Sequence, residues 1–295
     1  MKKVVLTGAT GFLGFALLTE LIRNNVYVYV LCRKNSRRRT RLAGISNVTV
    51  IETDPADIEK LDSVSDCDVF YHLAWEGGRN NFTEQYKNVD MSVNCLKLAS
   101  ELGCKRFICT GSQAEYGNAA GVITEDTSLN PVSSYGSCKA AAYHLTADLA
   151  KHLSIEHTWV RVFSVYGAND NPNSLIPYLA ETLRSNRNAV LRTDGEHMWN
   201  YLYEEDMARA LYLLGRSPLS DTVYNLASRS AKPLKEFVEE LRAAINPGAA
   251  VCYGSEKSKV NLDVSTDKLR RSIDEFEQAE FSETIRTIYS QRVSL

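Results

Sequence analysis

The chain has 295 residues, of which 44% are hydrophobic and 24% charged, which is typical of a folded domain and excludes a mostly disordered chain. Its 34 basic and 36 acidic side chains give a net charge of −2, so charge favours neither nucleic acid nor a membrane surface as a partner. No apolar run reaches the roughly 18 residues that span a bilayer. The stretch after Lys2 and Lys3 contains Thr7, Gly8 and Gly11, which do not fit a signal peptide. The seven cysteines form no Cys-x-x-Cys pair, which predicts reduced thiols in a cytoplasmic protein and no metal site.

Short apolar runs alternate with helical patterns along the first part of the chain. The runs that we expect to be strands are Val4–Leu6, Val26–Leu31, Val48–Ile51, Val69–Leu73, Phe107–Cys109 and Thr158–Val162. Between them, apolar residues recur at helical spacing in Phe15–Ile22, Val89–Leu102 and Ala140–Leu153. Continuous apolar strands are typical of a parallel sheet that is buried on both faces by crossover helices. The sequence therefore predicts an α/β fold with a doubly wound (Rossmann) parallel sheet.

The pattern changes after about Tyr166. A turn-rich segment over 167–172 precedes an expected helix at Leu175–Leu183 and a short strand at Ala189–Arg192. Further helices are expected at Leu234–Ile245 and Phe281–Tyr289. We expect a dinucleotide-binding domain over residues 1–165, to which 201–226 return. A smaller C-terminal substrate-binding domain is expected over 166–200 and 227–295.

A glycine-rich turn follows the first expected strand and opens the first expected helix. Gly8 permits a tight turn, Gly11 lets the backbone approach a diphosphate, and Gly14 lets the helix lie close to the strand. The helix N-terminus offers free N–H groups and a partial positive charge to phosphates. The turn therefore predicts a dinucleotide site, and its residues are Gly8, Thr10, Gly11, Phe12, Leu13 and Gly14.

The end of the second expected strand indicates which dinucleotide binds. An NAD site usually has Asp or Glu there, but this strand ends at Cys32 and Arg33 without an acid. A basic cluster follows, and Arg33 is the residue we expect to contact a 2′-phosphate, so NADP(H) is favoured and NAD(H) stays open. Most of the other basic residues over 34–41 are expected to form a solvated loop. No aromatic residues interleave them, so they do not indicate a nucleic-acid site.

Tyr135 and Lys139 are four residues apart before an alanine-rich helical stretch, so on a helix they share one face. A lysine ammonium beside a phenol stabilises the phenolate, which makes the tyrosine usable as a general acid or base. Ser112 follows the strand at Phe107–Cys109, at the strand end where open α/β sheets bind ligands. Ser112, Tyr135 and Lys139 are therefore the expected catalytic residues. Ser112 would hydrogen-bond a substrate oxygen while Tyr135 exchanges its proton.

These motifs together resemble the extended short-chain dehydrogenase/reductase family, the NAD(P)-dependent sugar-nucleotide epimerases, dehydratases and ketoreductases. The matching segments are Thr7–Gly14, Tyr71–Ala74, Asn88, Ser112 with Tyr116–Gly117, Tyr135 with Lys139, Arg161–Gly167 and Gly195–Asp206. The resemblance implies that Asp54 lies near the adenine, that Leu73 and Ala74 line the cofactor site, and that Phe163 lies beside the nicotinamide. It also implies a nucleotide-sugar substrate, and a homodimer formed through the helix that carries Tyr135.

The chain departs from the dehydratase pattern directly after Ser112. Dehydratases of this family have an acidic pair there, which removes a proton and protonates the departing hydroxide. This chain has Gln113 and Ala114 at those positions, and Glu115 is displaced by one residue and expected to point elsewhere. Elimination is therefore poorly supported, and the related sugar-acid decarboxylases lose support for the same reason.

Further departures lie among the residues expected to bind substrate. Trp199 replaces an arginine that usually clamps the substrate diphosphate, so either Arg184 or Arg192 takes that role or the substrate is unusual. Trp75 and Ser164 replace an alanine and an asparagine that are frequent near the sugar. The expected substrate-binding residues are Trp75, Ser112, Gln113, Ser164 and Trp199.

Three functions follow as hypotheses. The leading one is NADP(H)-dependent reduction of a nucleotide-linked 4-keto-6-deoxysugar by the Ser/Tyr/Lys group. The alternative is an NAD-dependent nucleotide-sugar 4-epimerase, which uses the same three residues. The third, from another class, is a redox sensor that binds NADP without catalysis, although such relatives commonly lose the Tyr/Lys pair that this chain keeps.

Overall fold

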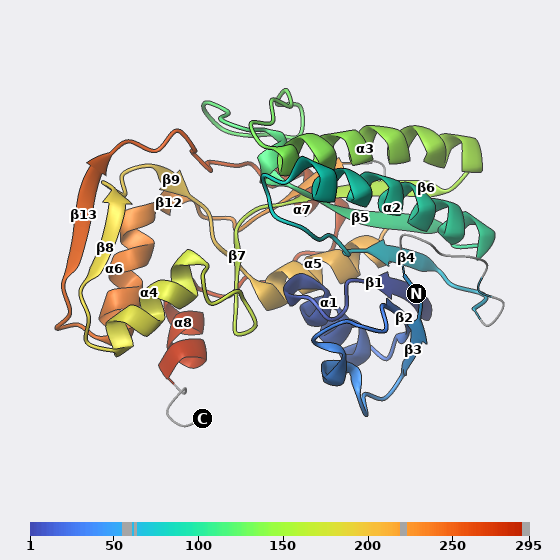
Figure 1. Cartoon of the computed structure of the whole chain (residues 1–295), viewed down its shortest axis with the longest axis horizontal. Coiled ribbons are helices and arrows are strands. Elements are labelled where there is room, and N and C mark those ends of the chain that lie inside the picture. The colour runs from blue at the N-terminus through green and yellow to red at the C-terminus, as the bar shows by residue number, and fades with distance from the viewer. Residues whose placement is uncertain (55–60, 62–63, 219–222, 291–295) are drawn as a thin grey trace.

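The computed structural model describes residues 1–54, 61, 64–218 and 223–290 of the chain. Within them, seven parallel strands form one sheet in the order β11–β6–β5–β4–β1–β2–β3 (Figure 1). Their bounds are Lys3–Thr7 (β1), Tyr27–Cys32 (β2), Val48–Glu52 (β3), Val69–His72 (β4), Arg106–Ser112 (β5), Glu156–Val162 (β6) and Val223–Leu226 (β11). The predicted doubly wound parallel sheet is confirmed, because every predicted run is a strand close to its expected bounds.

Helices cover both faces of this sheet (Figure 1). Their bounds are Phe12–Arg23 (α1) and Glu204–Arg216 (α5) on one face, and Phe82–Glu101 (α2) and Ser134–Leu153 (α3) on the other. Leu17 of α1 and Leu211 of α5 share a core cluster with Val28. Leu96 of α2 and Ala142 of α3 share the opposite cluster. Burial on both faces is what the continuous apolar strands require.

α2 and α3 begin well before the apolar spacing predicts, at Phe82 rather than Val89 and at Ser134 rather than Ala140. Asn81 caps α2, and its side chain accepts a hydrogen bond from the Glu84 nitrogen at 3.3 Å. Ser133 caps α3 and accepts from the Gly136 nitrogen at 3.1 Å. The first turns after these caps carry mostly polar or small residues, so hydrophobic periodicity misses them and the capping residues mark the helix starts.

The order of the strands reverses at β1, which lies between β2 and β4. Thr7 at the end of β1 pairs with His72 at the end of β4, so the two carboxyl ends lie side by side. The connection after β1 leads to β2 on one side, and the connection after β3 returns to β4 on the other side, which opens a crevice beyond the strand ends. The glycine turn after Thr7 and the loop after His72 therefore face the same space.

A second group of elements lies beside the sheet (Figure 1). Its helices are α4 (Leu175–Arg184), α6 (Leu234–Ile245) and α8 (Phe281–Ser290), and its parallel strand pair is β8 (Ala189–Thr193) with β13 (Val251–Glu256). They enclose a separate core cluster that includes Leu179, Phe237 and Ile285. Short elements complete the described fold: η1 (Arg39–Leu42), η2 (Gln113–Glu115), β7 (Val165–Tyr166), β9 (Met198–Trp199), β10 (Leu202–Tyr203), β12 (Lys232–Pro233) and α7 (Asp267–Ser272).

The chain leaves the sheet after β6 and comes back to it before the end. α5 packs in the same core cluster as α1, and β11 pairs with β6 as the edge strand, with Asn225 opposite Arg161. The elements that enclose the separate core cluster are thus drawn from two stretches of chain, before α5 and after β11. None of the helices in the described ranges combines the length and the apolar character needed to cross a membrane.

Candidate active site

The glycine turn between β1 and α1 forms one wall of a pocket of about 860 Å³. Gly8 has a φ of +80°, and a Cβ there would lie 2.6 Å from the Ala74 nitrogen. A Cβ at Gly14 would lie 2.1 Å from the Gly8 oxygen, so α1 approaches the turn closely because Gly14 has no side chain. Gly11 precedes α1 and provides no side-chain cap for its first N–H groups. The turn therefore fits the diphosphate of a dinucleotide.

A second pocket, of about 700 Å³, continues from the first toward α3. The two pockets have lining residues in common, which are Gly8, Gly11, Leu73, Trp75 and Glu76. The predicted cofactor residues divide between them. Thr10, Arg33, Asp54 and Ala74 line the first pocket, and Phe12, Leu13, Gly14, Tyr135, Lys139 and Phe163 line the second. The structure thus brings every predicted cofactor residue to one continuous crevice at the switch point of the sheet.

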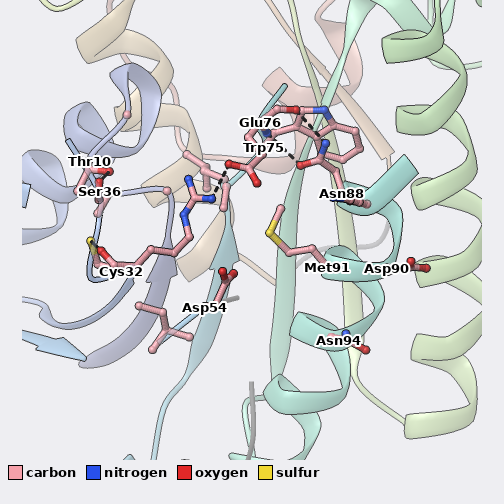
Figure 2. Close-up of a pocket in the computed structure, with 18 of the residues that line it drawn as sticks. Thr10, Cys32, Ser36, Asp54, Trp75, Glu76, Asn88, Asp90, Met91 and Asn94 are labelled. Carbon is pink, nitrogen blue, oxygen red and sulfur yellow. Dashed lines mark hydrogen bonds and ion pairs between the residues drawn. The ribbon is translucent and has the colours of Figure 1, made fainter. Parts of the chain in front are cut away.

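Arg33 and Glu76 form an ion pair across the first pocket, with 2.6 Å between Nη1 and Oε2. Figure 2 shows Thr10, Cys32 and Ser36 on one side of this pocket and Trp75, Glu76 and Asn88 on the other. Arg33 directly follows Cys32, so the ion pair joins the two sides. Both side chains are about half-exposed, at 47% and 53%. The guanidinium that is predicted to meet a 2′-phosphate therefore has a carboxylate partner, which an entering anion would have to replace.

The other basic residues near Arg33 have mixed surroundings. Arg39 forms an ion pair with Glu52, and the Arg41 guanidinium lies 5.5 Å from the centre of the Phe15 ring. Asp54 lines both the first pocket and an adjoining cavity of about 530 Å³, which Arg33 and Lys34 also line. This end of the crevice therefore contains charges of both signs.

His72 ends β4 directly beneath the crevice and is 1% exposed. Its ring nitrogens lie 2.8 Å from the Thr7 hydroxyl and 3.1 Å from the Ser92 hydroxyl. Burial lowers the pKa of His72 to about 3, so the ring is neutral at working pH. Its contacts join β1, β4 and α2, which is a structural arrangement rather than one suited to proton transfer.

Two buried amides of α2 hold the loop that follows β4. Asn88 accepts a hydrogen bond from the Glu76 nitrogen at 2.9 Å and donates to the Glu76 oxygen at 2.9 Å. Gln85 donates to the oxygens of Glu76 and Gly78, and accepts from the Trp75 indole nitrogen at 2.7 Å. The position of the Trp75 ring is therefore fixed from α2.

Tyr135 lies in the first turn of α3, and Lys139 lies one turn later. The Lys139 ammonium donates to the Thr110 oxygen at 2.6 Å and lies 3.6 Å from the centre of the Trp75 ring. It is 6.0 Å from the centre of the Tyr135 ring. The Tyr135 ring has Trp75 at its edge, at 6.1 Å, and the Arg79 guanidinium 4.8 Å from its centre. Both α3 residues face the second pocket, which Ser112 at the end of β5 also lines.

Glu115 points into the protein core, away from the crevice. It is fully buried and forms an ion pair with Arg161, with 2.8 Å between Oε2 and Nε. Oε1 accepts hydrogen bonds from the Ser112 nitrogen at 2.7 Å and the Trp159 indole nitrogen at 3.0 Å. The displaced acid therefore has a structural role, and Gln113 takes the place next to Ser112 in the second pocket.

The predicted substrate residues all line the second pocket, together with Arg79, Asp170 and Tyr201; they are Trp75, Ser112, Gln113, Ser164 and Trp199. The buried Gln113 Oε1 has no hydrogen-bond partner among the described residues. A buried acceptor without a partner is costly, and a donor on a bound ligand would remove that cost. This atom is therefore a candidate contact for a hydroxyl group of the ligand.

Neither arginine expected to compensate for Trp199 lies in this pocket. Arg184 on α4 hydrogen-bonds the Tyr289 oxygen and pairs with Glu181, and Arg192 lies exposed on β8. Among the described residues that line the second pocket, the basic side chains are Arg79 and Lys139. The sequence prediction placed the cation that would replace the missing arginine on residues close to Trp199 in the chain. The available cation comes instead from the loop after β4.

Residues 4–227 match the NAD dependent epimerase/dehydratase family. The chain belongs to this family. The prediction of an NAD(P)-dependent enzyme in the extended short-chain dehydrogenase/reductase group is therefore confirmed. No metal-binding group of three or more His, Cys, Asp or Glu side chains is formed by the residues that the structure describes.

Relatives in the epimerase/dehydratase family have names that cover several reactions. The chain is 23% identical to the dTDP-D-glucose 4,6-dehydratase of Dictyostelium discoideum, over 77% of this chain and 58% of that protein, so it spans less than two thirds of that relative. It is 24% identical to the dTDP-6-deoxy-L-talose 4-dehydrogenase (NAD(+)) of Aggregatibacter actinomycetemcomitans, over 82% of this chain and 90% of that protein. Its fold is similar to that of UDP-glucuronic acid 4-epimerase from Bacillus cereus in complex with NAD, with a TM-score of 0.86, 21% identity, and coverage of 98% and 96% of the two chains.

Three residues of this epimerase/dehydratase chain were missed by sequence reasoning. Glu76, Arg79 and Gln85 all lie on or contact the loop after β4, where each meets a predicted site residue. Their only sequence signal is position, because a loop that follows a strand next to the switch point faces the ligand crevice. Their partners come from distant segments, which motif spacing does not reveal.

Proposed function

We propose that the chain reduces a nucleotide-linked 4-keto-6-deoxysugar with NADPH, using Ser112, Tyr135 and Lys139. The observation that carries this proposal is the burial of Glu115 in its ion pair with Arg161. It supports a pocket in which an amide, rather than an acid, stands beside the catalytic hydroxyl. Such a pocket favours a plain exchange of hydride and proton at a carbonyl over elimination of water.

Several features of the crevice fit a nicotinamide dinucleotide. The turn at Gly8 and Gly14 leaves no room for a Cβ, and the uncapped N-terminus of α1 suits a diphosphate. Arg33 and Lys34, with no acid at the end of β2, support a 2′-phosphate at the far end. When bound, the nicotinamide supplies the hydride.

The residues of the chain would supply everything else that the reduction needs. The Tyr135 hydroxyl would donate its proton to the substrate oxygen as negative charge develops there, and the Ser112 hydroxyl would hydrogen-bond the same oxygen. The Lys139 ammonium, held by the Thr110 carbonyl and the Trp75 ring, would stabilise the phenolate that Tyr135 becomes. Gln113 Oε1 would accept a hydrogen bond from a sugar hydroxyl. The Arg79 guanidinium, which lies 4.8 Å from the centre of the Tyr135 ring, would bind an electron-rich group of the sugar.

A nucleotide-sugar 4-epimerase with tightly held NAD is the second candidate. The observation that favours it is the Arg33–Glu76 ion pair, because it engages the guanidinium that would otherwise select a 2′-phosphate. A non-catalytic NADP sensor has less support, since Ser112, Tyr135 and Lys139 all line one pocket.

The deciding experiment incubates the purified chain with a panel of nucleotide sugars, keto and non-keto, with NADPH, NADH or no added cofactor. A reductase consumes NADPH and adds two hydrogens to a 4-keto-6-deoxysugar, as read by mass spectrometry. Isomerisation of a non-keto sugar without added cofactor would support the epimerase instead. Tyr135→Phe should lower turnover about a thousandfold while dinucleotide binding persists, and full activity in that variant would refute the mechanism.

A matched pair of variants tests the cofactor assignment. Arg33→Ala should raise the KM for NADPH far more than the KM for NADH, because it removes the cation for the 2′-phosphate. Glu76→Gln should lower the KM for NADPH, because it frees Arg33 from its carboxylate partner. Equal changes in the KM for NADPH and the KM for NADH in both variants would overturn the NADPH assignment. The substrate panel would then still decide between reduction and epimerisation.

A further inference from the structure

Two buried cysteines lie at the amino ends of two neighbouring strands, at the end of the sheet opposite the crevice. Cys67 precedes β4 and Cys104 precedes β5, and both thiols are free. They lie in the same core cluster and are 3% and 6% exposed. The sequence predicts reduced thiols because no Cys-x-x-Cys pair occurs, and 36 residues separate these two cysteines in the chain. The fold instead makes them neighbours.

The register of β4 and β5 brings the segments before these two strands side by side. β4 and β5 are parallel, with Val69 paired to Arg106, and the Lys105 nitrogen donates to the Asp68 oxygen at 3.2 Å. Cys67 and Cys104 directly precede this hydrogen-bonded pair in the two segments. Neighbouring strands lie about 4.8 Å apart, which is within the Cα separation of about 4.4–6.8 Å that disulfides span. Both side chains also belong to the same core cluster, on one face of the sheet.

The surroundings make the two thiols unequal. The neighbouring Cys104 thiol, together with the nearby Lys3 ammonium, lowers the pKa of Cys67 in spite of burial. The neighbouring Cys67 thiol, together with burial, raises the pKa of Cys104. Asp66 beside Cys67 and Gly103 beside Cys104 are exposed, so the pair lies just beneath the surface. This is the pattern of an attacking thiol beside a resolving thiol.

We propose that Cys67 and Cys104 form a reversible disulfide when the folded protein meets a hydroperoxide. The Cys67 thiolate attacks one peroxide oxygen; an S–O bond forms, the O–O bond breaks, and the other oxygen leaves as an alcohol or water. The Cys104 sulfur then loses its proton and attacks the Cys67 sulfur; the S–S bond forms, the S–O bond breaks, and water leaves. Two thiols are oxidised by two electrons in total, and one peroxide is reduced. The proposal does not depend on the proposed function.

The test treats the folded full-length chain with hydrogen peroxide, alkylates the remaining thiols, and maps tryptic peptides without reduction. Cys67 and Cys104 are the single cysteines of the expected peptides 61–79 and 98–105. We expect these two peptides to be linked in the monomeric fraction, with the loss of two hydrogens, and to separate after treatment with a thiol reductant. The Cys104→Ser variant should accumulate a sulfenic acid at Cys67 that dimedone traps, and Cys67→Ser should yield no linked peptide.

Two controls make the result specific to the fold. Cys252 is exposed and reports that the reagents reach the protein. Oxidation of the chain unfolded in urea should spread the links over several cysteine pairs. If Cys67 and Cys104 are both alkylated in the folded, peroxide-treated chain, the proposal is wrong. A link from Cys67 to any other cysteine, or an oxidised Cys67 without the link to Cys104, would overturn it as well.

Discussion

The Lys139 ammonium lies between two groups of different chemistry, the carbonyl of Thr110 and the face of the Trp75 ring. The carbonyl fixes the ammonium by a hydrogen bond, and the ring attracts it by a cation–π interaction at 3.6 Å. Sequence reasoning assigned Trp75 to the substrate. Its contacts support a second role, as a positioning residue for Lys139, because Gln85 holds the indole in place from α2.

Trp75→Leu should lower kcat about tenfold, since it removes a cation–π interaction of about 1–2 kcal/mol. Trp75→Phe keeps an aromatic face and should recover most of kcat, although it loses the hydrogen bond to Gln85. Steady-state kinetics with both variants provide the measurement. Equal losses of kcat in the two variants would contradict a role of the aromatic face in positioning Lys139. A change in KM alone would show that the ring acts on substrate binding.

The junction of β5 with η2 depends on one buried carboxylate, that of Glu115. Glu115 accepts hydrogen bonds from the Ser112 nitrogen and the Trp159 indole while it pairs with Arg161. Ser112 in turn accepts from the Ala114 nitrogen, which completes a capping box. The position of the Ser112 hydroxyl, which we propose to be catalytic, therefore depends on this ion pair in the core.

Glu115→Gln should destabilise the fold by about 3–5 kcal/mol, because it leaves the Arg161 guanidinium buried without a counter-charge. Urea unfolding measures the loss. Glu156→Gln is the matched control, since Glu156 also pairs with an arginine on the same sheet but is 64% exposed. That control should cost less than about 1 kcal/mol, and a similar loss in both variants would contradict the argument.

A second buried acid begins α5. Glu204 Oε1 accepts from the Ala168 nitrogen at 2.8 Å, while Oε2 is buried without a partner among the described residues. Burial raises the pKa of Glu204 from 4.5 to about 7. Between these values the folded chain holds a proton that the unfolded chain has lost. The free energy of unfolding therefore falls as pH rises through this window.

The free energy of unfolding should fall by about 3 kcal/mol between pH 4.5 and 7 because of Glu204. Glu204→Gln should flatten the pH dependence of stability in this window, because the side chain no longer ionises. Glu205→Gln is the control, since its carboxylate is half-exposed and pairs with Arg23. Urea unfolding at several pH values measures the slope, and an unchanged slope in Glu204→Gln would contradict the assignment.

Elements with strong local signals were predictable from sequence, and pairings between distant segments were not. Continuous apolar runs marked all six strands up to Val162, because five of these strands are largely buried and the edge strand β3 is partly buried. The two-residue strands β9 and β10 carry too few residues for any periodicity. In the candidate site, spacing within one motif found Tyr135 and Lys139. The contact of Arg33 with Glu76 joins residues that no local pattern connects.

On the surface of the molecule, α2 and α3 carry several exposed apolar side chains. Phe82 and Tyr86 of α2 are 63% and 52% exposed, and Leu145 of α3 is 52% exposed. The two helices cover the same face of the sheet (Figure 1). The family resemblance implies a homodimer through the helix that carries Tyr135, and these side chains are the apolar surface that such an interface would bury.

Leu145→Glu combined with Phe82→Glu should convert a dimer into a monomer, because it puts charges where the interface would be apolar. Size-exclusion chromatography with light scattering provides the measurement. Val190→Glu is the control, since Val190 is 68% exposed on β8 in the other part of the molecule. A wild-type chain that is already monomeric would refute this interface.

The return of α5 and β11 to the sheet affects how this enzyme can be recombined with its relatives. A chimera with a single junction after β6 would exchange the edge strand β11 together with the proposed substrate side of the crevice. The new strand would then have to pair with a foreign β6. Exchanging only the substrate side requires three junctions, two around residues 167–200 and one after Leu226. Evolution of new specificity by whole-segment exchange is therefore constrained here, and point changes in the lining loops are the easier route.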